Sequence, residues 1–424
     1  MAFKALTKEE TRKHYPEDLK LVGTHIFFRH DWPLCSGTRN MLATVYLNGD
    51  SRLQGGVLPW KRLIERVRKD DGLDVSSANF NLCNHGELTD LGRTSMVQLG
   101  RELRKQYITN LSLLPSVLSN PSTVYFRSSP FPRALESLQH VVWGMFPPEA
   151  RAPEFGPVTI AQRGERDETL LPNEDFCARF IQLCKAYTKR TSERWDKSDE
   201  PEPQKIHAIY DGITSTLATD KASGVRLPEA FYDKKLGEIV DRLAYEEEFG
   251  GYRENRELRM VGIGAMLGDV VERMVSKAEH NARSAPKSTS IDDGGNGEAG
   301  VGTNGTKLWL HGSHDSTLGA VMASLGADEP IEGERRWPPY GSVIAIELFR
   351  DTQAEETSPQ PPSRWPSFSL SRQCHHPICR TPISQLSQAQ KSRLQNYYIR
   401  AYQIELNQQG FVSKGLRYNG YREH

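Results

Sequence analysis

The sequence lacks an excess of charge of either sign. Lysine plus arginine and aspartate plus glutamate each number 54 among the 424 residues, so the chain has no global field that would attract nucleic acid or an anionic membrane surface. We therefore expect no nucleic-acid partner, and any attraction to a phosphate group must be local. Apolar runs long enough to cross a bilayer are absent too, so we expect no integral membrane segment.

A secretory leader and a dense set of cysteines are also missing. The first 20 residues have no apolar core, and Glu9 and Glu10 are unusual in a transit peptide. Six cysteines are few for a chain of this length, and without a leader we expect them to be reduced thiols. These absences predict an intracellular protein, most simply a cytoplasmic one.

The sequence motifs of several enzyme classes cannot be found. There is no lysine-containing phosphate loop and no Gly-x-Ser-x-Gly elbow. The glycines of residues 262–268 lie in a helical pattern without a preceding strand, which argues against dinucleotide binding. Residues 374–379, Cys-His-His-x-x-Cys, have metal-like spacing but no second half. We therefore expect neither a metal site nor a cofactor.

An apolar stretch that ends in polar residues occurs three times in the chain. Such short runs are typical of buried strands, and in open α/β sheets ligands bind at the carboxyl ends of the strands. The polar residues that follow the three runs are Arg29 and His30, Arg127, and His314 and Asp315.

The second and third stretches lead directly into helical patterns. Apolar residues recur on one helical face after Pro132 and again after Asp315, and Gly326 ends the latter pattern. The free N–H groups and the dipole at the amino end of a helix favour an anion. Together, the three stretches predict a phosphate site.

These motifs resemble those of the histidine acid phosphatases, branch two of the histidine phosphatase superfamily. The likeness is strongest to the lysophosphatidic acid phosphatase subgroup, and it spans about residues 18–350. It rests on Arg29-His30, on Arg127-Ser128-Ser129 with Arg133 and Glu136-Ser137, on His314-Asp315, and on matches within residues 88–107 and 337–348.

The resemblance implies an α/β fold with a central, mostly parallel sheet flanked by helices. Residues 18–147 and 307–424 would form this phosphatase core, and residues 148–280 an inserted helical cap domain. Helical patterns at 175–195, 227–249 and 256–275 fit such a cap, although helices that merely pack on the sheet would look the same. Residues 281–306 are rich in Gly, Ser and Asn, which predicts a disordered loop.

The resemblance also implies an acid phosphatase that hydrolyses small phosphomonoesters, including a lysophospholipid phosphate, through a phosphohistidine and without a metal. His30 would be the nucleophile, Asp315 would protonate the leaving group, and Arg29, Arg127 and His314 would bind the phosphoryl oxygens. Arginine offers paired donors to phosphate and keeps its charge. A cationic His314 would favour acidic pH, and a neighbouring dianion would keep Asp315 protonated.

Two arginine positions complicate this interpretation. Arg133 is typical of a solvated cation on a helix surface, so we leave it out of the predicted site. His25, at the start of its strand, is predicted to be structural for a separate reason, because it lies away from the carboxyl end. After the catalytic histidine the family has Gly-x-Arg-x-Pro, whereas here Asp31-Trp32-Pro33 follows directly. A segment with a second phosphate-binding arginine is thus missing. This departure keeps two rivals open: an inactive family member that binds a phosphate ligand or acts as a scaffold, and a phosphoryl mutase.

Overall fold

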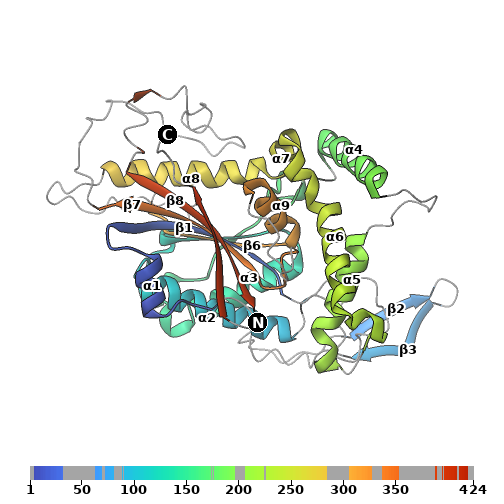
Figure 1. Cartoon of the computed structure of the whole chain (residues 1–424). Coiled ribbons are helices and arrows are strands. Elements are labelled where there is room, and N and C mark those ends of the chain that lie inside the picture. The colour runs from blue at the N-terminus through green and yellow to red at the C-terminus, as the bar shows by residue number, and fades with distance from the viewer. Residues whose placement is uncertain are drawn as a thin grey trace.

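A seven-stranded mixed sheet forms the centre of the described part of the chain (Figure 1). In order across the sheet, the strands are β5 (Ile160–Ala161), β4 (Val124–Ser128), β6 (Leu308–Ser313), β1 (Leu19–Arg29), β7 (Val343–Asp351), β8 (Tyr397–Asn407) and β9 (Gly410–Tyr418). Neighbours from β5 to β1 are parallel, and those from β1 to β9 are antiparallel. A separate antiparallel pair joins β2 (Leu63–Arg68) to β3 (Gly72–Phe80).

The structure is a computed structural model, and the residues it describes are 4–31, 63–68, 72–80, 88, 90–172, 174, 176–195, 206–223, 226–283, 305–326, 337–352, 387–388, 394, 396–407 and 410–418. Three stretches discussed above lie outside this set: residues 32–62, most of the predicted loop at 281–306, and the Cys-His segment at 374–379. Within it, no helix combines the length and the apolar character needed to cross a bilayer.

Helices cover both faces of the sheet (Figure 1). They are α1 (Lys8–His14), α2 (Asp90–Arg104), α3 (Pro132–Met145), α4 (Ala178–Trp195), α5 (Ile206–Ser223), α6 (Lys234–Glu254), α7 (Arg256–Gly262), α8 (Gly264–Arg283) and α9 (Asp315–Leu325), with a π-helical turn at Lys105–Asn110. Helices α2 and α3 lie on one face and α8 and α9 on the other, while α4, α5 and α6 gather beyond one end of the sheet.

Successive side chains of strand β1 point to opposite faces of the sheet, and helices cover both faces, so the strand is buried on both sides. Ile26 and Phe28 pack with the core residues of α2 and α3. Phe27 instead packs with the core residues of α6, α8 and α9. This arrangement explains the continuous apolar run in the sequence, since neither face of the strand meets water.

Helices α2 and α3 approach each other closely through a pair of glycines. A methyl group at Gly100 would lie 2.1 Å from the carbonyl oxygen of Val141, and one at Gly144 would lie 2.1 Å from that of Val97. Any larger residue at either position would push the helices apart. The first turn of α3 lies at the sheet edge because the helix begins at Pro132, close after the end of β4 at Ser128.

The predicted helices between the second and third motifs are present as α4, α6 and the α7–α8 pair. Helix α5 was not predicted, because its 18 residues include a glycine and several threonines and serines, which have low helix propensity. Apolar residues of these helices form one buried cluster with a face of the sheet, which joins Phe180, Tyr210, Phe249 and Met266 to Phe27.

Candidate active site

The carboxyl ends of β1, β4 and β6 lie side by side, as the motifs predicted. Arg29 of β1 is level with Ser313 of β6, and Arg127 of β4 is level with His311. The backbone N–H of His30 donates to the Ser313 carbonyl at 3.0 Å, which extends the ladder by one residue. Helices α3 and α9 both begin at this edge, so their amino ends face the same space.

His30 is held in a single tautomer. Its Nδ1 lies 3.1 Å from the carbonyl oxygen of Asp31, which can only accept, so Nδ1 carries the proton. Nε2 accepts a hydrogen bond from Nε of Arg133 at 3.0 Å and therefore bears a lone pair. Burial, and next the charge of Arg133, hold the pKa of His30 well below its usual range. The lowered pKa favours the neutral imidazole, which has its lone pair at Nε2.

His314 lies next to His30 and completes a pair of imidazoles. The two ring centroids are 5.0 Å apart at an angle of 70°, and His314 Nε2 lies 2.7 Å from the hydroxyl of Ser129. Burial, with Arg133 next, lowers the pKa of His314 to about 3. In the free site this imidazole is therefore neutral at pH 5, and the cation predicted from the sequence concerns a site that holds a phosphoryl group.

Arg29 is a buried cation that faces two carboxylates. Its Nη2 lies 2.6 Å from Asp315 and 3.5 Å from Asp211, a residue of α5. Its Nη1 donates to the Pro338 carbonyl at 2.7 Å, and its guanidinium lies 3.8 Å from the centre of the Tyr340 ring. The hydroxyl of Tyr340 in turn donates to Asp211 at 2.8 Å.

Asp315 is ionised in the free site. Burial alone would raise its pKa, but Arg29 and His314 outweigh burial, so that the pKa lies below its ordinary value. The indole N–H of Trp337 and the backbone N–H of Ser316 also donate to it, at 3.0 and 2.9 Å. Asp315 is therefore a carboxylate in the free site, and the protonated form predicted from the sequence requires a neighbouring dianion.

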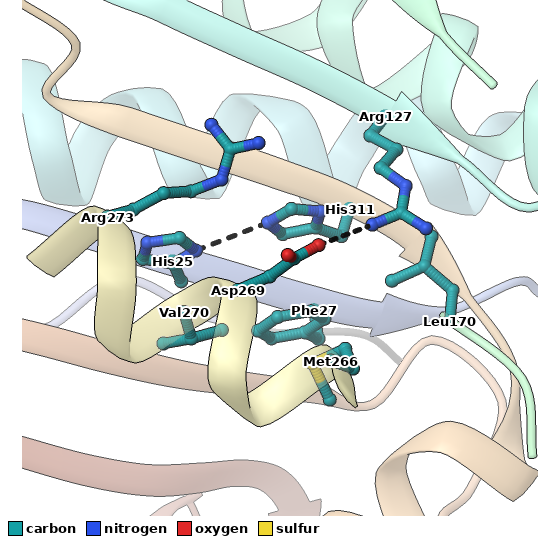
Figure 2. Close-up of a pocket in the computed structure, with 9 residues that line it drawn as sticks. All are labelled: His25, Phe27, Arg127, Leu170, Met266, Asp269, Val270, Arg273 and His311. Atoms are coloured by element: carbon teal, nitrogen blue, oxygen red, sulfur yellow. Dashed lines mark hydrogen bonds and ion pairs between the residues drawn. The ribbon is translucent and has the colours of Figure 1, made fainter. Parts of the chain in front are cut away.

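Arg127 lies at the same end of the sheet but is engaged elsewhere. Its Nη2 donates to Glu168 at 2.5 Å and to Thr169 Oγ1 at 3.0 Å, and its Nη1 lies 3.6 Å from Asp269. Figure 2 shows its guanidinium facing Asp269 of α8, at a small cavity on the α8 side of the sheet. The contacts among the described residues thus join Arg29, His30, His314 and Asp315, whereas Arg127 is turned toward carboxylates.

His25 lines the same small cavity (Figure 2), and His30 is not among the residues of that lining. Its Nδ1 lies 3.3 Å from His311 Nε2, and its ring stacks on Trp309 with 4.5 Å between centroids. Burial lowers the pKa of both imidazoles well below the usual range. His25 therefore belongs to the neutral packing of the sheet, in keeping with the structural role predicted for it.

Three residues beside His30 and Arg29 were not among the predicted site residues: Arg133, Asp211 and Tyr340. Arg133 had a usable signal, because it lies in the first turn of a helix that begins where β4 ends. Asp211 had none, since its helix was not predicted. Tyr340 follows the Trp337 motif, but nothing local distinguishes it from a core aromatic residue.

Comparison with known proteins decides the family. A profile of the histidine phosphatase superfamily (branch 2) matches residues 65–361, which include Arg127, His314 and Asp315. The chain belongs to this family. The match begins after Arg29 and His30, so it is the pairing of β1 with β6 that brings these two residues to the others.

Proteins named as phosphatases in several organisms are similar to this chain. A probable acid phosphatase of Schizosaccharomyces pombe is 31% identical over 378 residues, covering 81% of this chain and 76% of the relative. The human lysophosphatidic acid phosphatase type 6 is 24% identical over 280 residues, covering 64% of this chain and 58% of the relative. The chain thus spans less than two thirds of the human protein.

The solved structure of the phytase from Klebsiella sp ASR1 shares the fold. It superimposes with a TM-score of 0.52 at 15% identity, covering 96% of this chain and 91% of the phytase. Together with the family match, this confirms the α/β fold and the histidine acid phosphatase resemblance expected from the motifs. The sheet itself is mixed, because β7, β8 and β9 are joined to it by antiparallel pairings.

Proposed function

We propose that this protein is an acid phosphatase that hydrolyses phosphomonoesters through a phosphohistidine on His30. The observation that carries the proposal is the tautomer of this residue. A neutral imidazole with its proton on Nδ1 and a lone pair on Nε2 is ready to attack phosphorus. Family membership supports the same chemistry, since the similar proteins include one named an acid phosphatase.

In this proposal, cations and hydrogen-bond donors at the strand ends stabilise the transferring phosphoryl group. Arg29 is fully buried and stands beside His30, so that a phosphoryl oxygen would meet its charge in a site with little water. His314 would donate from Nε2, in place of its contact with Ser129. Arg127 would serve after turning from Asp269, with which its contact is long at 3.6 Å.

Binding of the phosphoryl group would also convert Asp315 into an acid. In the free site Arg29 pairs with Asp315 and lowers the pKa of that carboxyl. A phosphate that takes over Arg29 removes this stabilisation and brings its own negative charge, so the pKa of Asp315 rises. The protonated carboxyl then donates to the leaving oxygen as the bond from phosphorus to that oxygen breaks.

We propose that residues 148–280 act as a cap that contributes to substrate choice. The support is Asp211 of α5, which reaches Arg29 and Tyr340. A lysophospholipid phosphate is our specific candidate for the substrate, because the relative named lysophosphatidic acid phosphatase type 6 is similar. Phe131, 40% exposed and 5.2 Å from the His314 ring, offers apolar surface beside the site.

We also propose that the protein acts inside the cell. Cys177 and Cys184, the two cysteines among the described residues, are both unpaired, as thiols are in a reducing compartment. Cell fractionation with an antibody against the protein tests this, and recovery from the medium or a secretory organelle would reject it.

A second candidate function is phosphate-ligand binding without turnover. The observation that favours it lies in the sequence after His30, where Asp31 stands directly in place of the Gly-x-Arg-x-Pro segment of the family. The family match also begins only at residue 65. This candidate predicts that inorganic phosphate binds while neither an aryl phosphate nor lysophosphatidate is hydrolysed.

The decisive experiment is to trap the intermediate. A radiolabelled aryl phosphate is mixed with enzyme at pH 5 and quenched in alkali, which preserves phosphohistidine. We expect label on the unaltered protein, none on His30→Ala, and normal labelling of His140→Ala, a buried histidine of α3 outside the site. Turnover by folded His30→Ala would reject the assignment, and phosphate binding without label would favour the second candidate.

A further inference from the structure

Two carboxylates meet the same nitrogen of Arg29. Asp315 lies 2.6 Å and Asp211 3.5 Å from its Nη2, so the two side chains are neighbours, although one begins α9 and the other belongs to α5. In the proposed reaction Asp315 gives its proton to the leaving oxygen, whereas Asp211 has no part. A carboxylate next to the leaving-group acid faces the alcohol half of any ester that reaches His30.

Helix α5 holds Asp211 in a fixed position because its first turn is bonded to α6. The hydroxyl of Tyr210 donates to Asp241 at 2.6 Å, and the backbone N–H of His207 donates to Glu247 at 3.0 Å. The Asp211 side chain is nevertheless 38% exposed. Its carboxylate is therefore both positioned by the helix and accessible to a ligand.

Binding of a phosphoryl group changes what surrounds Asp211. In the free site the carboxylate lies beside Arg29 and accepts from the hydroxyl of Tyr340 at 2.8 Å. Once phosphoryl oxygens take over Arg29, the neutral donor of Tyr340 remains. A carboxylate in this state gains from a further hydroxyl or ammonium donor and is repelled by a second negative charge.

The two neighbouring carboxylates share one proton when an ester is bound. Burial first, and the charge of Asp315 as well, raise the pKa of Asp211. A proton on Asp315 removes that repulsion, so Asp211 keeps its charge. Its greater exposure, 38% against 20% for Asp315, favours the same distribution. The acid and the remaining anion thus stand side by side at the alcohol half of the ester.

We propose that Asp211 is a specificity-determining residue: it accepts a hydrogen bond from a hydroxyl near the leaving oxygen and excludes esters with a second negative charge there. The inference rests on the proposed function and adds the substrate class. That class is the phosphomonoester of a neutral, hydroxylated alcohol, as opposed to a bisphosphate or a phosphorylated acid. Asp211 transfers no proton, so its effect lies in KM more than in kcat.

Two esters that differ by one charge test this selection. Glycerol 2-phosphate and 2-phosphoglycerate both release a secondary alcohol, but the latter has a carboxylate in place of one hydroxymethyl group. Their kcat/KM values are compared at pH 6 in the unaltered protein, Asp211→Asn, Asp211→Ala and Glu238→Gln. The last variant is the control, because it removes one carboxylate from an exposed position on α6, where Glu238 faces Lys234.

We expect the unaltered protein to prefer glycerol 2-phosphate, and Asp211→Asn to lose about fivefold of that preference, the factor that a half-exposed charge pair contributes. The loss should lie in the ratio of the two KM values. Asp211→Ala should lose the same preference and bind glycerol 2-phosphate less tightly than Asp211→Asn, because the amide still offers an oxygen to a hydroxyl. Glu238→Gln should keep the preference of the unaltered protein.

An unchanged preference in Asp211→Asn would overturn the inference, as would an equal loss in Glu238→Gln. Should Asp211→Ala fail to fold, the comparison of Asp211→Asn with the control decides. Calorimetry with both esters on His30→Ala, with and without Asp211→Asn, measures the same preference without turnover, and an equal preference in the two proteins would also overturn it. Failure of the proposed function is seen separately, as absence of the phosphohistidine label.

Discussion

Two arginine–carboxylate pairs are built into the same sheet, and they differ in what surrounds them. Arg29 and Asp315 lie 2.6 Å apart at the carboxyl end of the parallel strands. Arg400 and Glu347 lie 2.5 Å apart in the antiparallel half, on β8 and β7. Each pair contains one group that is essentially inaccessible to water, Arg29 in the first and Glu347 in the second. The distances alone do not distinguish a site from a structural joint.

The partners of the two pairs do distinguish them. Glu347 accepts from the hydroxyls of Tyr15 and Tyr107 at 2.8 and 3.0 Å and from both Nε and Nη2 of Arg400. One anion thus meets one cation and two neutral donors. Arg400 further donates to the carbonyl of His14, which ties α1 to the sheet.

The Arg29 pair is unbalanced by comparison. Its single cation faces the two carboxylates Asp315 and Asp211, whose side chains are 20% and 38% exposed. Either carboxylate can therefore return to water when a phosphate takes its place at Arg29. The Arg29–Asp315 pair, which we call the exchangeable pair, has alternative partners and access to solvent and belongs to the site. The Arg400–Glu347 pair, which we call the saturated pair, stabilises the fold.

Changing each carboxylate to its amide tests this difference, and the largest effect is expected at Asp315. Asp315→Asn removes the leaving-group acid, so hydrolysis of an alkyl phosphate should fall by about 100- to 10,000-fold. Aryl phosphates, whose leaving groups need no proton, should lose far less. The free energy of unfolding should change little, because Arg29 keeps Asp211 at 3.5 Å. Equal losses for both kinds of ester would count against the acid role.

The matched change at Glu347 should have the opposite outcome. Glu347→Gln leaves Arg400 without its anion, and breaking a buried pair destabilises a protein by about 3 kcal/mol or more. Urea unfolding measures this loss, and kcat of the folded fraction should stay unchanged. Tyr15→Phe, which removes one of four donors, should cost about 1 kcal/mol. A drop in kcat for folded Glu347→Gln would show that the two pairs are not separate in function.

The sequence predicted the parallel half of the sheet, which holds Arg29 and Asp315, better than the antiparallel half, which holds Glu347 and Arg400. Apolar runs followed by Arg29, Arg127 and His314 predict buried strands. Strands that run parallel bring their carboxyl ends to one edge of the sheet. The antiparallel additions carry no such signal, because the partner of Glu347 lies on a strand 53 residues further along the chain. Local patterns do not record pairing over that distance.

The same limit explains which site residues the sequence revealed. His30, His314 and Asp315 follow directly from strand ends. Asp211 depends on how a long helical insertion folds back over the sheet, which periodicity does not encode. Arg133 was assigned to solvent because a position in a first helical turn can face either water or a site. The hydrogen bond from Arg133 to His30 decides between them, and it depends on where α3 begins after β4.

Restoring the missing segment should strengthen the exchangeable pair without affecting the saturated one. Insertion of a Gly-x-Arg-x-Pro loop from a close relative after His30 adds one charge-assisted phosphate contact, worth about 1.5–3 kcal/mol. We therefore expect aryl-phosphate turnover at pH 5 to rise at least about tenfold. Circular dichroism and urea unfolding check that the fold and its stability are unaltered. No gain from a well-folded insertion, or full activity without it, would mean that this segment does not limit the site.

The smallest effect, and the one most specific to the exchangeable pair, is expected at Asp211. Burial raises the pKa of this carboxyl, while Arg29 opposes that shift, so the residue competes with phosphate for one cation. Asp211→Asn keeps the hydrogen bond from Tyr340 but removes the competing charge. Because exposed or half-exposed charge pairs contribute up to about 1 kcal/mol, inorganic phosphate should bind up to about fivefold more tightly and KM should fall, with little change in kcat. Ser215→Ala, which removes only the hydroxyl 2.9 Å from that of Tyr340, is the matched control and should leave phosphate affinity unchanged. Weaker phosphate binding in Asp211→Asn would mean that the carboxylate orients Arg29 for the substrate instead of competing with it.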